Sequence, residues 1–308
     1  LTVKSRMESS TSGGYSMTPT LTDLLTTLCA EVVIERSTSE QYARAERRLS
    51  QRLARSATID DLNAETINDY LAWIKTEFEL SNTSVRNYRA AIIRIWNFAT
   101  DRYDHQACVV RRIRSPKRDP VTVRAWTLPS LVQLMEAAES LAGTLRCGIP
   151  ANIFMSAWVW VGYESGFRPS DMRELQWSAI DFDNSKITIC QHKTKKIHTA
   201  KFGTESLAWL KKLREYGQKD VFPLNKFGVR RWEGFLYARA EKLGFHRLPG
   251  QGIGTLRKCH ATQVDADRGI AAAAESLGHV GGTVTARNHY VDAREKTGFL
   301  PRNPRENI

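Results

Sequence analysis

Apolar residues recur at helical spacing through the first third of the chain. In segment 63–78, Ile67, Tyr70, Leu71 and Ile74 fall three or four residues apart and share one helical face. Segment 81–102 carries a longer stripe of the same kind, and segments 18–32 and 37–54 open with the Ser, Thr and Pro residues that favour helix starts. We expect residues 20–104 to form a bundle of four amphipathic helices.

Residues 126–308 mix helical and strand patterns. Segment 151–166 is apolar on almost every side, which is typical of a buried helix. Segment 185–191 alternates around Ile187 and Ile189 and predicts a strand, followed by a polar turn at 192–196 and a return strand at 197–202. Further helices are expected at 128–143, 204–217, 228–244 and 255–269. The chain therefore predicts a mainly α fold with a small antiparallel β-sheet.

The charge pattern adds a basic linker between these two parts. The 308 residues carry a net charge of +12, which favours a polyanionic partner, most often nucleic acid. Segment 105–126 holds six cations against the single acid Asp119, a net charge of +5, and Pro116 and Pro120 disfavour a helix there. We expect residues 105–125 to form an extended linker that tracks DNA phosphates through Arg111, Arg112, Arg114, Lys117 and Arg118. Arg86 and Arg89 lie off the apolar stripe of segment 81–102 and are further DNA-binding candidates.

Several other classes of protein are disfavoured. No run of about 18 apolar residues indicates a membrane span. Residues 1–19 are rich in Ser, Thr and Gly and predict a disordered tail rather than a secretory signal. Five scattered cysteines suit a reducing interior, so we expect a cytoplasmic protein. Cys190, His192 and His198 lie close in sequence, but intervening lysines would repel a cation, and we expect neither a metal nor a cofactor.

Five polar residues of the second part stand where the local pattern does not require them: Arg168, Lys193, Arg257, His279 and Tyr290. Each has an ordinary interpretation. Arg168 could pair with Asp171 or Glu174, Arg257 with Asp265 or Asp267, and His279 could cap a helix or lie in the core. Lys193 could be a solvated turn lysine and Tyr290 a buried aromatic. Their order along the chain favours a joint function.

In this order the chain resembles the tyrosine recombinase, or phage integrase, family. The first family box is similar to SGFRPSDMRELQW at 165–177, where Arg168 matches the arginine and Asp171 the acid. The hairpin lysine falls on Lys193 in HKTKK, and the second box on GTLR with Arg257. The third box is LGH with His279, and the nucleophile falls on Tyr290.

The resemblance implies a helical core-binding domain at 20–104 and an α+β catalytic domain at 126–308. It also implies DNA strand exchange through a 3′-phosphotyrosyl intermediate, with a homotetramer on DNA that is a monomer or dimer when free. Arg168, Arg257 and His279 would hold the scissile phosphate, Tyr290 would attack it, and Lys193 would protonate the leaving oxygen. We therefore expect a site-specific recombinase of a phage or mobile element, active in DNA integration.

Two departures leave alternatives open. The His of the second box is Gly254 here, so a catalytically impaired DNA-binding relative is one alternative. His260, three residues after Arg257, could stand in for the missing side chain, and with Asp171 it is an auxiliary candidate. Gly298, Pro301 and Pro304 oppose a long terminal helix, which leaves the coupling within a tetramer open. A type IB topoisomerase-like enzyme is the other alternative. The target sequence, and whether the protein integrates, excises or resolves, cannot be read from one chain.

Overall fold

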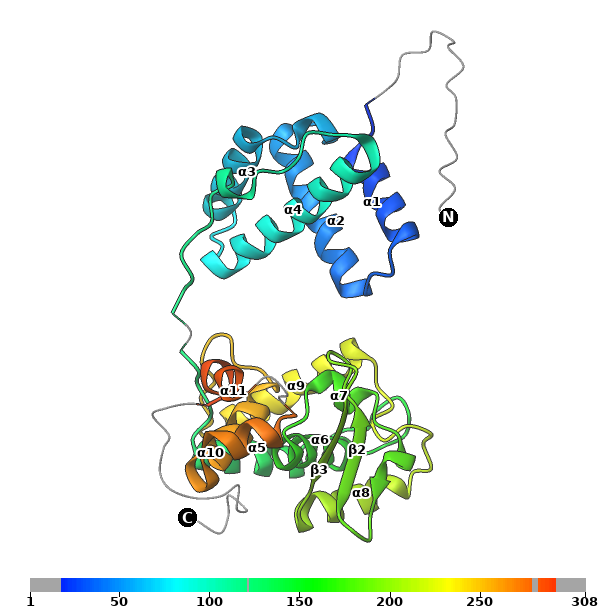
Figure 1. The fold of residues 1–308 in the computed structure, drawn as a ribbon. Coiled ribbons are helices and arrows are strands. Elements are labelled where there is room, and N and C mark those ends of the chain that lie inside the picture. The colour runs from blue at the N-terminus through cyan, green and yellow to red at the C-terminus, as the bar shows by residue number, and fades with distance from the viewer. Residues whose placement is uncertain (1–17, 121, 279–281, 292–308) are drawn as a thin grey trace. The chain divides into compact units, whose positions relative to one another are not determined.

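The computed structural model describes residues 18–120, 122–278 and 282–291, and the chain divides into two compact units, Leu1–Pro120 and Val121–Ile308 (Figure 1). The division falls inside the segment expected to be a linker, near its end. No helix among the described residues combines the length and the apolar character needed to cross a bilayer.

The first unit is a bundle of four α-helices: α1 (Leu21–Glu31), α2 (Arg36–Leu53), α3 (Ala64–Glu77) and α4 (Asn82–Tyr103). Short 3-10 turns lie at Ile59–Asp61 and Val110–Arg112. Thr20 caps α1 by accepting a hydrogen bond from the Asp23 amide at 3.2 Å. The apolar stripes meet in one core, where Leu24, Tyr70 and Ile92 have no exposed surface. Thr18 donates to Asp60 at 3.1 Å, so the ordered chain includes residues placed in the expected tail.

Most of the expected linker is packed against this bundle rather than extended. The His105 ring contacts the Leu62 carbonyl at 3.1 Å, and the Trp96 indole donates to the Gln106 carbonyl at 2.7 Å. Further along, Asn68 bonds the backbone on both sides of Ile113, which is itself 2 % exposed. The prediction of an extended linker from residue 105 therefore needs correction, because side chains of α3 and α4 satisfy the backbone of this segment.

Arg86 and Arg89 provide further contacts with this segment. Arg86 donates to the Ser115 hydroxyl at 2.8 Å and to the Pro116 carbonyl at 2.9 Å. Arg89 donates to the carbonyls of Val110 and Ile113 at 2.9 and 3.0 Å. Both guanidinium groups thus hold the basic segment onto α4. Their position off the apolar stripe has a structural reason that is independent of DNA.

The second unit contains seven α-helices among its described residues and a three-stranded antiparallel sheet of order β1-β2-β3. The helices are α5 (Leu128–Glu139), α6 (Ala151–Ser165), α7 (Pro169–Arg173), α8 (Thr204–Arg214), α9 (Lys226–Glu241), α10 (Thr255–Ser276) and α11 (Thr283–His289). The strands are β1 (Ile180–Asp181), β2 (Lys186–Cys190) and β3 (Ile197–Lys201), with a 3-10 turn at Trp177–Ala179 before the sheet. The mainly helical fold class with a small antiparallel sheet is confirmed, and β1 is an addition to the expected hairpin.

Helix α6 is the centre of this unit. Its residues are buried on every side, as its all-round apolar sequence predicts, and Trp158, Trp160 and Phe154 have no exposed surface. Helices α5, α8, α9 and α10 contact it. In the sheet, Ile187 and Ile189 of β2 face this core. The C-terminal end of α6 therefore lies where the surrounding elements converge, and the first arginine box begins there.

Helix α10 continues beyond the end that its sequence predicts. We expected a helix over 255–269, because glycine commonly ends helices. The observed element runs to Ser276, and Gly269 adopts φ 82° and ψ 168°, so two helical pieces meet at a break. The second piece brings the chain back to Leu277 and Gly278, directly before His279, which lies outside the described residues.

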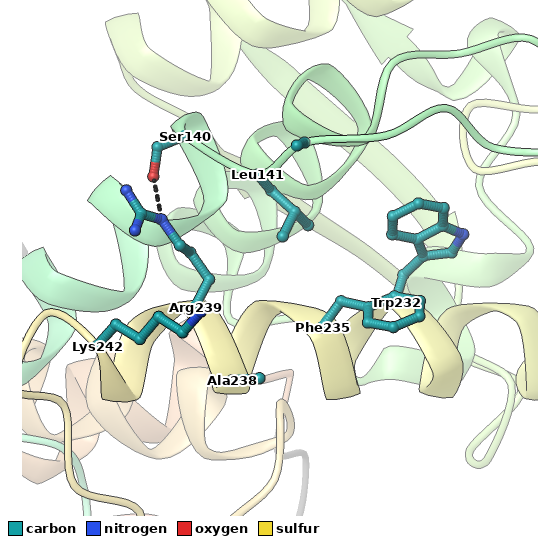
Figure 2. Close-up of a pocket in the computed structure, with 8 residues that line it drawn as sticks. Ser140, Leu141, Trp232, Phe235, Ala238, Arg239 and Lys242 are labelled. Atoms are coloured by element: carbon teal, nitrogen blue, oxygen red, sulfur yellow. Dashed lines mark hydrogen bonds between the residues drawn. The ribbon is translucent and has the colours of Figure 1, made fainter.

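A separate hollow in this unit lies between the end of α5 and α9 (Figure 2). Figure 2 shows Trp232 and Phe235 of α9 beside Leu141, with the Arg239 guanidinium donating to the Ser140 hydroxyl at 3.0 Å. None of the residues that the sequence singles out for catalysis lines this hollow.

Candidate active site

The turn between α6 and α7 places Arg168. Gly166 ends α6 in the left-handed conformation, with φ 64° and ψ 18°, which glycine adopts without strain. Arg168 follows in an extended conformation, and Pro169 starts α7, where its fixed φ suits the first helical position. The local sequence therefore turns the chain sharply and fixes the Arg168 backbone at the start of a short helix.

Asp171 connects this turn to the β2–β3 hairpin. Its carboxylate, in a residue only 3 % exposed, accepts from the Arg168 amide at 3.3 Å and lies 3.7 Å from the Arg168 guanidinium. The other carboxylate oxygen accepts from the His192 amide at 2.9 Å. Asp171 thus fixes both Arg168 and the residue that precedes Lys193. Lys193 itself is exposed in the turn between the two strands.

Arg257 is held by backbone carbonyls in the first turn of α10. Although only 2 % of the residue is exposed, its guanidinium donates to the carbonyl of Gly166 and, at 2.9 Å, to that of Leu277. Of the partners considered from the sequence, Asp267 pairs with Arg268, at 3.0 Å. Burial, and next the charge of Arg168, lower the pKa of Arg257 to about 10, so the group remains cationic at neutral pH.

Tyr290 lies against both arginines. It follows α11, its amide bonds the Ala286 carbonyl at 2.9 Å, and its ring centre is 4.9 Å from the Arg257 guanidinium carbon. The charges of Arg257 and Arg168 both act on the phenol hydroxyl. Burial raises the pKa of Tyr290, but the favourable interactions of the phenolate with Arg257 and Arg168 outweigh it, and the net shift is downward. The structure therefore joins residues 168, 257 and 290, which are distant in sequence.

Three further observations concern the remaining candidates. His279 lies outside the described residues, so its side chain is not placed. Gly254 precedes α10 at φ −60°, and a Cβ built there would meet only Pro169, at 3.9 Å, so there is space for a side chain. The ring of His260 is 5 % exposed and bonds the Tyr163 carbonyl at 2.9 Å.

Two polar residues at the base of the hairpin were missed by sequence reasoning. Gln191, which is fully buried, donates to the Leu277 carbonyl at 3.2 Å, and His198 bonds the Ser276 carbonyl at 3.1 Å. A Cβ at Gly278 would lie 2.8 Å from the Gln191 amide nitrogen, so this turn requires glycine. Both residues hold the backbone before His279. Nothing in the sequence indicates that Gln191, a polar residue beside a polar turn, is buried. His198 was considered only as a metal ligand.

The geometry does not bring a metal-ligand set together. His192 lies 3.4 Å from Glu174, whereas His198 faces α10 and Cys190 is exposed at the end of β2. Within the described ranges, no group of three or more His, Cys, Asp and Glu side chains could hold a metal ion. The chemical resources of the site are instead two fixed guanidinium groups and a phenol whose ionised form they stabilise. Such a pair of guanidinium groups can bind the oxygens of an anionic group while the phenol attacks the central atom of that group.

Comparison with solved structures gives the same fold. A lambda integrase tetramer bound to a Holliday junction aligns with a TM-score of 0.70 and 18% identity, over 93% of this chain and 82% of that one. The Tn1549 transposon integrase, in complex with a circular intermediate DNA, aligns with a TM-score of 0.66 and 14% identity, over 94% of this chain and 100% of that one. At such identities the likeness concerns the fold. No curated protein matches the chain.

Sequence comparison identifies the family directly. The Phage integrase family model matches residues 129–296, which is more than half of the 308 residues and includes both arginines and Tyr290. The match begins at the start of α5 and extends past α11. The chain belongs to the phage integrase family.

Proposed function

We propose that the protein is a site-specific DNA recombinase that cleaves and rejoins strands through a 3′-phosphotyrosyl intermediate. The observation that carries this proposal is the position of the Tyr290 ring 4.9 Å from the Arg257 guanidinium carbon, where the charges of Arg257 and Arg168 lower the pKa of the phenol. The same cations that lower the pKa of the phenol are positioned to bind the phosphate that it attacks. A tyrosine that served only to fill the core would not need a buried arginine against its ring and the charge of a second arginine nearby.

In the proposed cleavage step, the Tyr290 oxygen attacks phosphorus and the bond from phosphorus to the 5′ oxygen breaks. Arg168 and Arg257 bind the non-bridging oxygens, on which negative charge accumulates in the transition state. One guanidinium nitrogen of Arg168, Nη1, is buried without a hydrogen-bond partner among the described residues, as a donor awaiting a phosphate oxygen would be. His279 would add a further hydrogen bond to the same phosphate. Attack by a 5′ hydroxyl from another strand then releases Tyr290 and completes the exchange.

Lys193 is the proposed general acid. It would donate its ammonium proton to the 5′ oxygen as that oxygen leaves. The Asp171 contacts with Arg168 and with the His192 amide support this role, because they link the hairpin turn to the phosphate-binding arginine. Asp171 is a positioning residue in this scheme.

Strand exchange can be separated from the two alternative activities in one series of experiments. The protein is mixed with a nicked duplex, and a covalent protein–DNA adduct is sought, followed by joined strands between two different duplexes. A recombinase gives both products at a defined sequence. An impaired relative binds DNA without forming an adduct, and a topoisomerase-like enzyme relaxes supercoiled DNA without choosing a site. Failure to form an adduct on any duplex would refute the proposal.

The test of Lys193 uses a change in the leaving group. Replacing Lys193 with Ala should slow cleavage of an ordinary strand by about a hundredfold or more, because the 5′ oxygen then leaves unprotonated. A substrate with sulfur at the 5′ bridging position needs no acid and should be cleaved at nearly the normal rate. Single-turnover cleavage of both substrates is measured. Lys196→Ala, in the same turn, is the matched control. Equal slowing of the Lys193 variant on both substrates would assign Lys193 to another role. So would the same pattern of slowing and rescue in the Lys196 variant.

We propose that the first unit also contacts DNA. The basic segment held by Arg86 and Arg89 presents Arg111, Arg112, Arg114, Lys117 and Arg118, all of them exposed. A packed segment presents these cations in a defined arrangement and loses less conformational entropy on binding than a mobile linker would. We therefore retain them as phosphate contacts, with Arg86 and Arg89 as their support.

Salt dependence tests this interface. Changing Arg111, Arg112 and Arg114 to Ala should reduce the slope of log K against log salt concentration by about one unit per lost phosphate contact. The control is a triple Ala variant at Arg36, Arg52 and Arg102, which removes the same charge from arginines paired with Glu40, Asp69 and Glu31. If both triple variants change the slope equally, only net charge matters and the segment does not contact DNA.

Assembly and biological setting complete the proposal. We propose a homotetramer on DNA and a role in the integration of a phage or other mobile element, within the cytoplasm. The lambda integrase that shares this fold was solved as a tetramer on a Holliday junction, and the Tn1549 integrase with transposon DNA. These structures support the proposal of a DNA-bound tetramer.

A further inference from the structure

His260 holds the C-terminal end of α6 against α10. A carbonyl oxygen only accepts, so the 2.9 Å contact with Tyr163 requires that Nδ1 of His260 carries the proton. Tyr163 lies in the last turn of α6, where carbonyls have no partner within the helix. One turn earlier on α10, Arg257 donates to the carbonyl of Gly166. The first turns of α10 thus bind two carbonyl groups, three residues apart, at the end of α6.

The His260 ring also fits closely against Gly166. A Cβ at position 166 would lie 2.6 Å from the Cδ2 atom of His260, and the positive φ of Gly166 independently disfavours other residues. The ring therefore occupies the space that a side chain at 166 would need. Arg168 is only two residues beyond this contact, so the position of its backbone depends on the fit.

This arrangement opposes an electrostatic repulsion. Arg168 and Arg257 carry like charges, the charge of Arg168 lowers the pKa of Arg257, and both cations stabilise the ionised form of Tyr290. The Asp171 carboxylate contacts Arg168 at 3.7 Å and also accepts a hydrogen bond from the His192 amide. Without a rigid connection between α6 and α10, the two cations would separate.

We propose that His260 is a positioning residue, which sets the spacing of Arg168 and Arg257 around Tyr290 through its hydrogen bond to the Tyr163 carbonyl. This proposal rests on the function proposed for Tyr290. It differs from the idea that His260 replaces the histidine missing at position 254. Burial lowers the pKa of His260 to about 4, so its ring is neutral near pH 7, and its only proton is already donated to Tyr163. His260 therefore acts through the arginines and transfers no proton to the phosphate.

The test uses side chains that reproduce one ring nitrogen at a time. His260→Asn places an amide N–H near the position of Nδ1, whereas His260→Gln places it near Nε2, and His260→Phe keeps a ring without a donor. The first measurement is the pKa of Tyr290, obtained as the difference between ultraviolet phenolate titrations with and without Tyr290→Phe. Because the nearby arginines lower this pKa, it should rise in the Phe and Gln variants and return toward the wild-type value in the Asn variant.

The second measurement is single-turnover cleavage of a nicked duplex by the same proteins. The Phe and Gln variants should lose rate on the order of a hundredfold, as small displacements of catalytic groups do, with DNA affinity nearly unchanged. The Asn variant should recover most of the rate. An unchanged Tyr290 pKa in folded His260→Phe, or equal behaviour of Asn and Gln, would overturn the proposal. If the wild-type protein cleaves no DNA, the proposed function fails, while the titration still tests the role of His260.

Discussion

Replacing Tyr290 with Phe should abolish the covalent protein–DNA adduct and leave DNA affinity almost unchanged. The substitution removes only the hydroxyl, while the ring remains over the Arg257 guanidinium. Without this oxygen no bond to phosphorus can form, so the loss should be complete rather than partial. Adduct formation on a nicked duplex is measured by denaturing electrophoresis, and affinity by titration with the same DNA.

The matched control is Tyr216→Phe, at a partly exposed tyrosine in the same unit. This variant should form the adduct at the wild-type rate. An adduct that persists in Tyr290→Phe would show that another residue attacks the phosphate. A large loss of affinity in Tyr290→Phe would instead indicate that the hydroxyl is needed for binding.

The second large effect concerns Arg257. Arg257→Lys should lower the cleavage rate by roughly a hundredfold to a thousandfold, the usual consequence of removing one preorganised transition-state donor. The planar guanidinium bonds the carbonyls of Gly166 and Leu277 with two different nitrogens, and an ammonium group cannot reproduce this geometry. The rate is measured under single-turnover conditions on a nicked duplex.

Arg268→Lys provides the control for Arg257→Lys, because Arg268 lies on the same helix with its side chain 68% exposed and paired with Asp267. This variant should cleave normally. Thermal unfolding of both variants separates a catalytic effect from loss of the fold. Normal cleavage by a folded Arg257→Lys protein would mean that charge alone, without the guanidinium geometry, is sufficient at this position.

Regular elements could be predicted from the sequence because their periodic patterns are strong. The four helices of the first unit and the β2–β3 hairpin follow apolar positions that repeat every three to four or every two residues. Strand β1 was not predicted, since two residues, Ile180 and Asp181, are too few to show alternation. The continuation of α10 past Gly269 was also missed, because glycine at that position is equally typical of a helix end.

Contacts between side chains and distant carbonyls leave no pattern in the sequence comparable to the periodicity of helices and strands. Arg86 and Arg89 were candidates for DNA binding from their exposed helical positions, yet their guanidinium groups hold residues 110–116. His260 lies three residues after Arg257, on the same side of the helix, and was therefore a candidate phosphate ligand. In the structure it binds a carbonyl of α6 instead. These partners lie 21 or more residues away, so only the folded chain reveals them.

The central triad of Arg168, Arg257 and Tyr290 could be anticipated as a set, although no periodicity joins it. The order of the family boxes indicated these residues, and in the structure the Tyr290 ring lies against the Arg257 guanidinium, with the charges of both arginines lowering the pKa of the phenol. The role of Gly254 could not be deduced in the same way. A Cβ at this position would meet only Pro169, at 3.9 Å. Local packing therefore leaves room for a side chain there, and no neighbouring side chain among the described residues fills the place of the missing histidine.

The most direct measurement is identification of the amino acid that carries DNA after reaction of the wild-type protein with a nicked duplex. The nick lets the fragment beyond the cleavage site diffuse away and traps the covalent intermediate. Protease and nuclease digestion followed by mass spectrometry then locates the modified peptide. We expect a nucleotide attached through its 3′ phosphate to Tyr290. Attachment to any other residue, or no covalent product on a duplex that the protein binds specifically, would contradict the assignment of Tyr290 as the nucleophile.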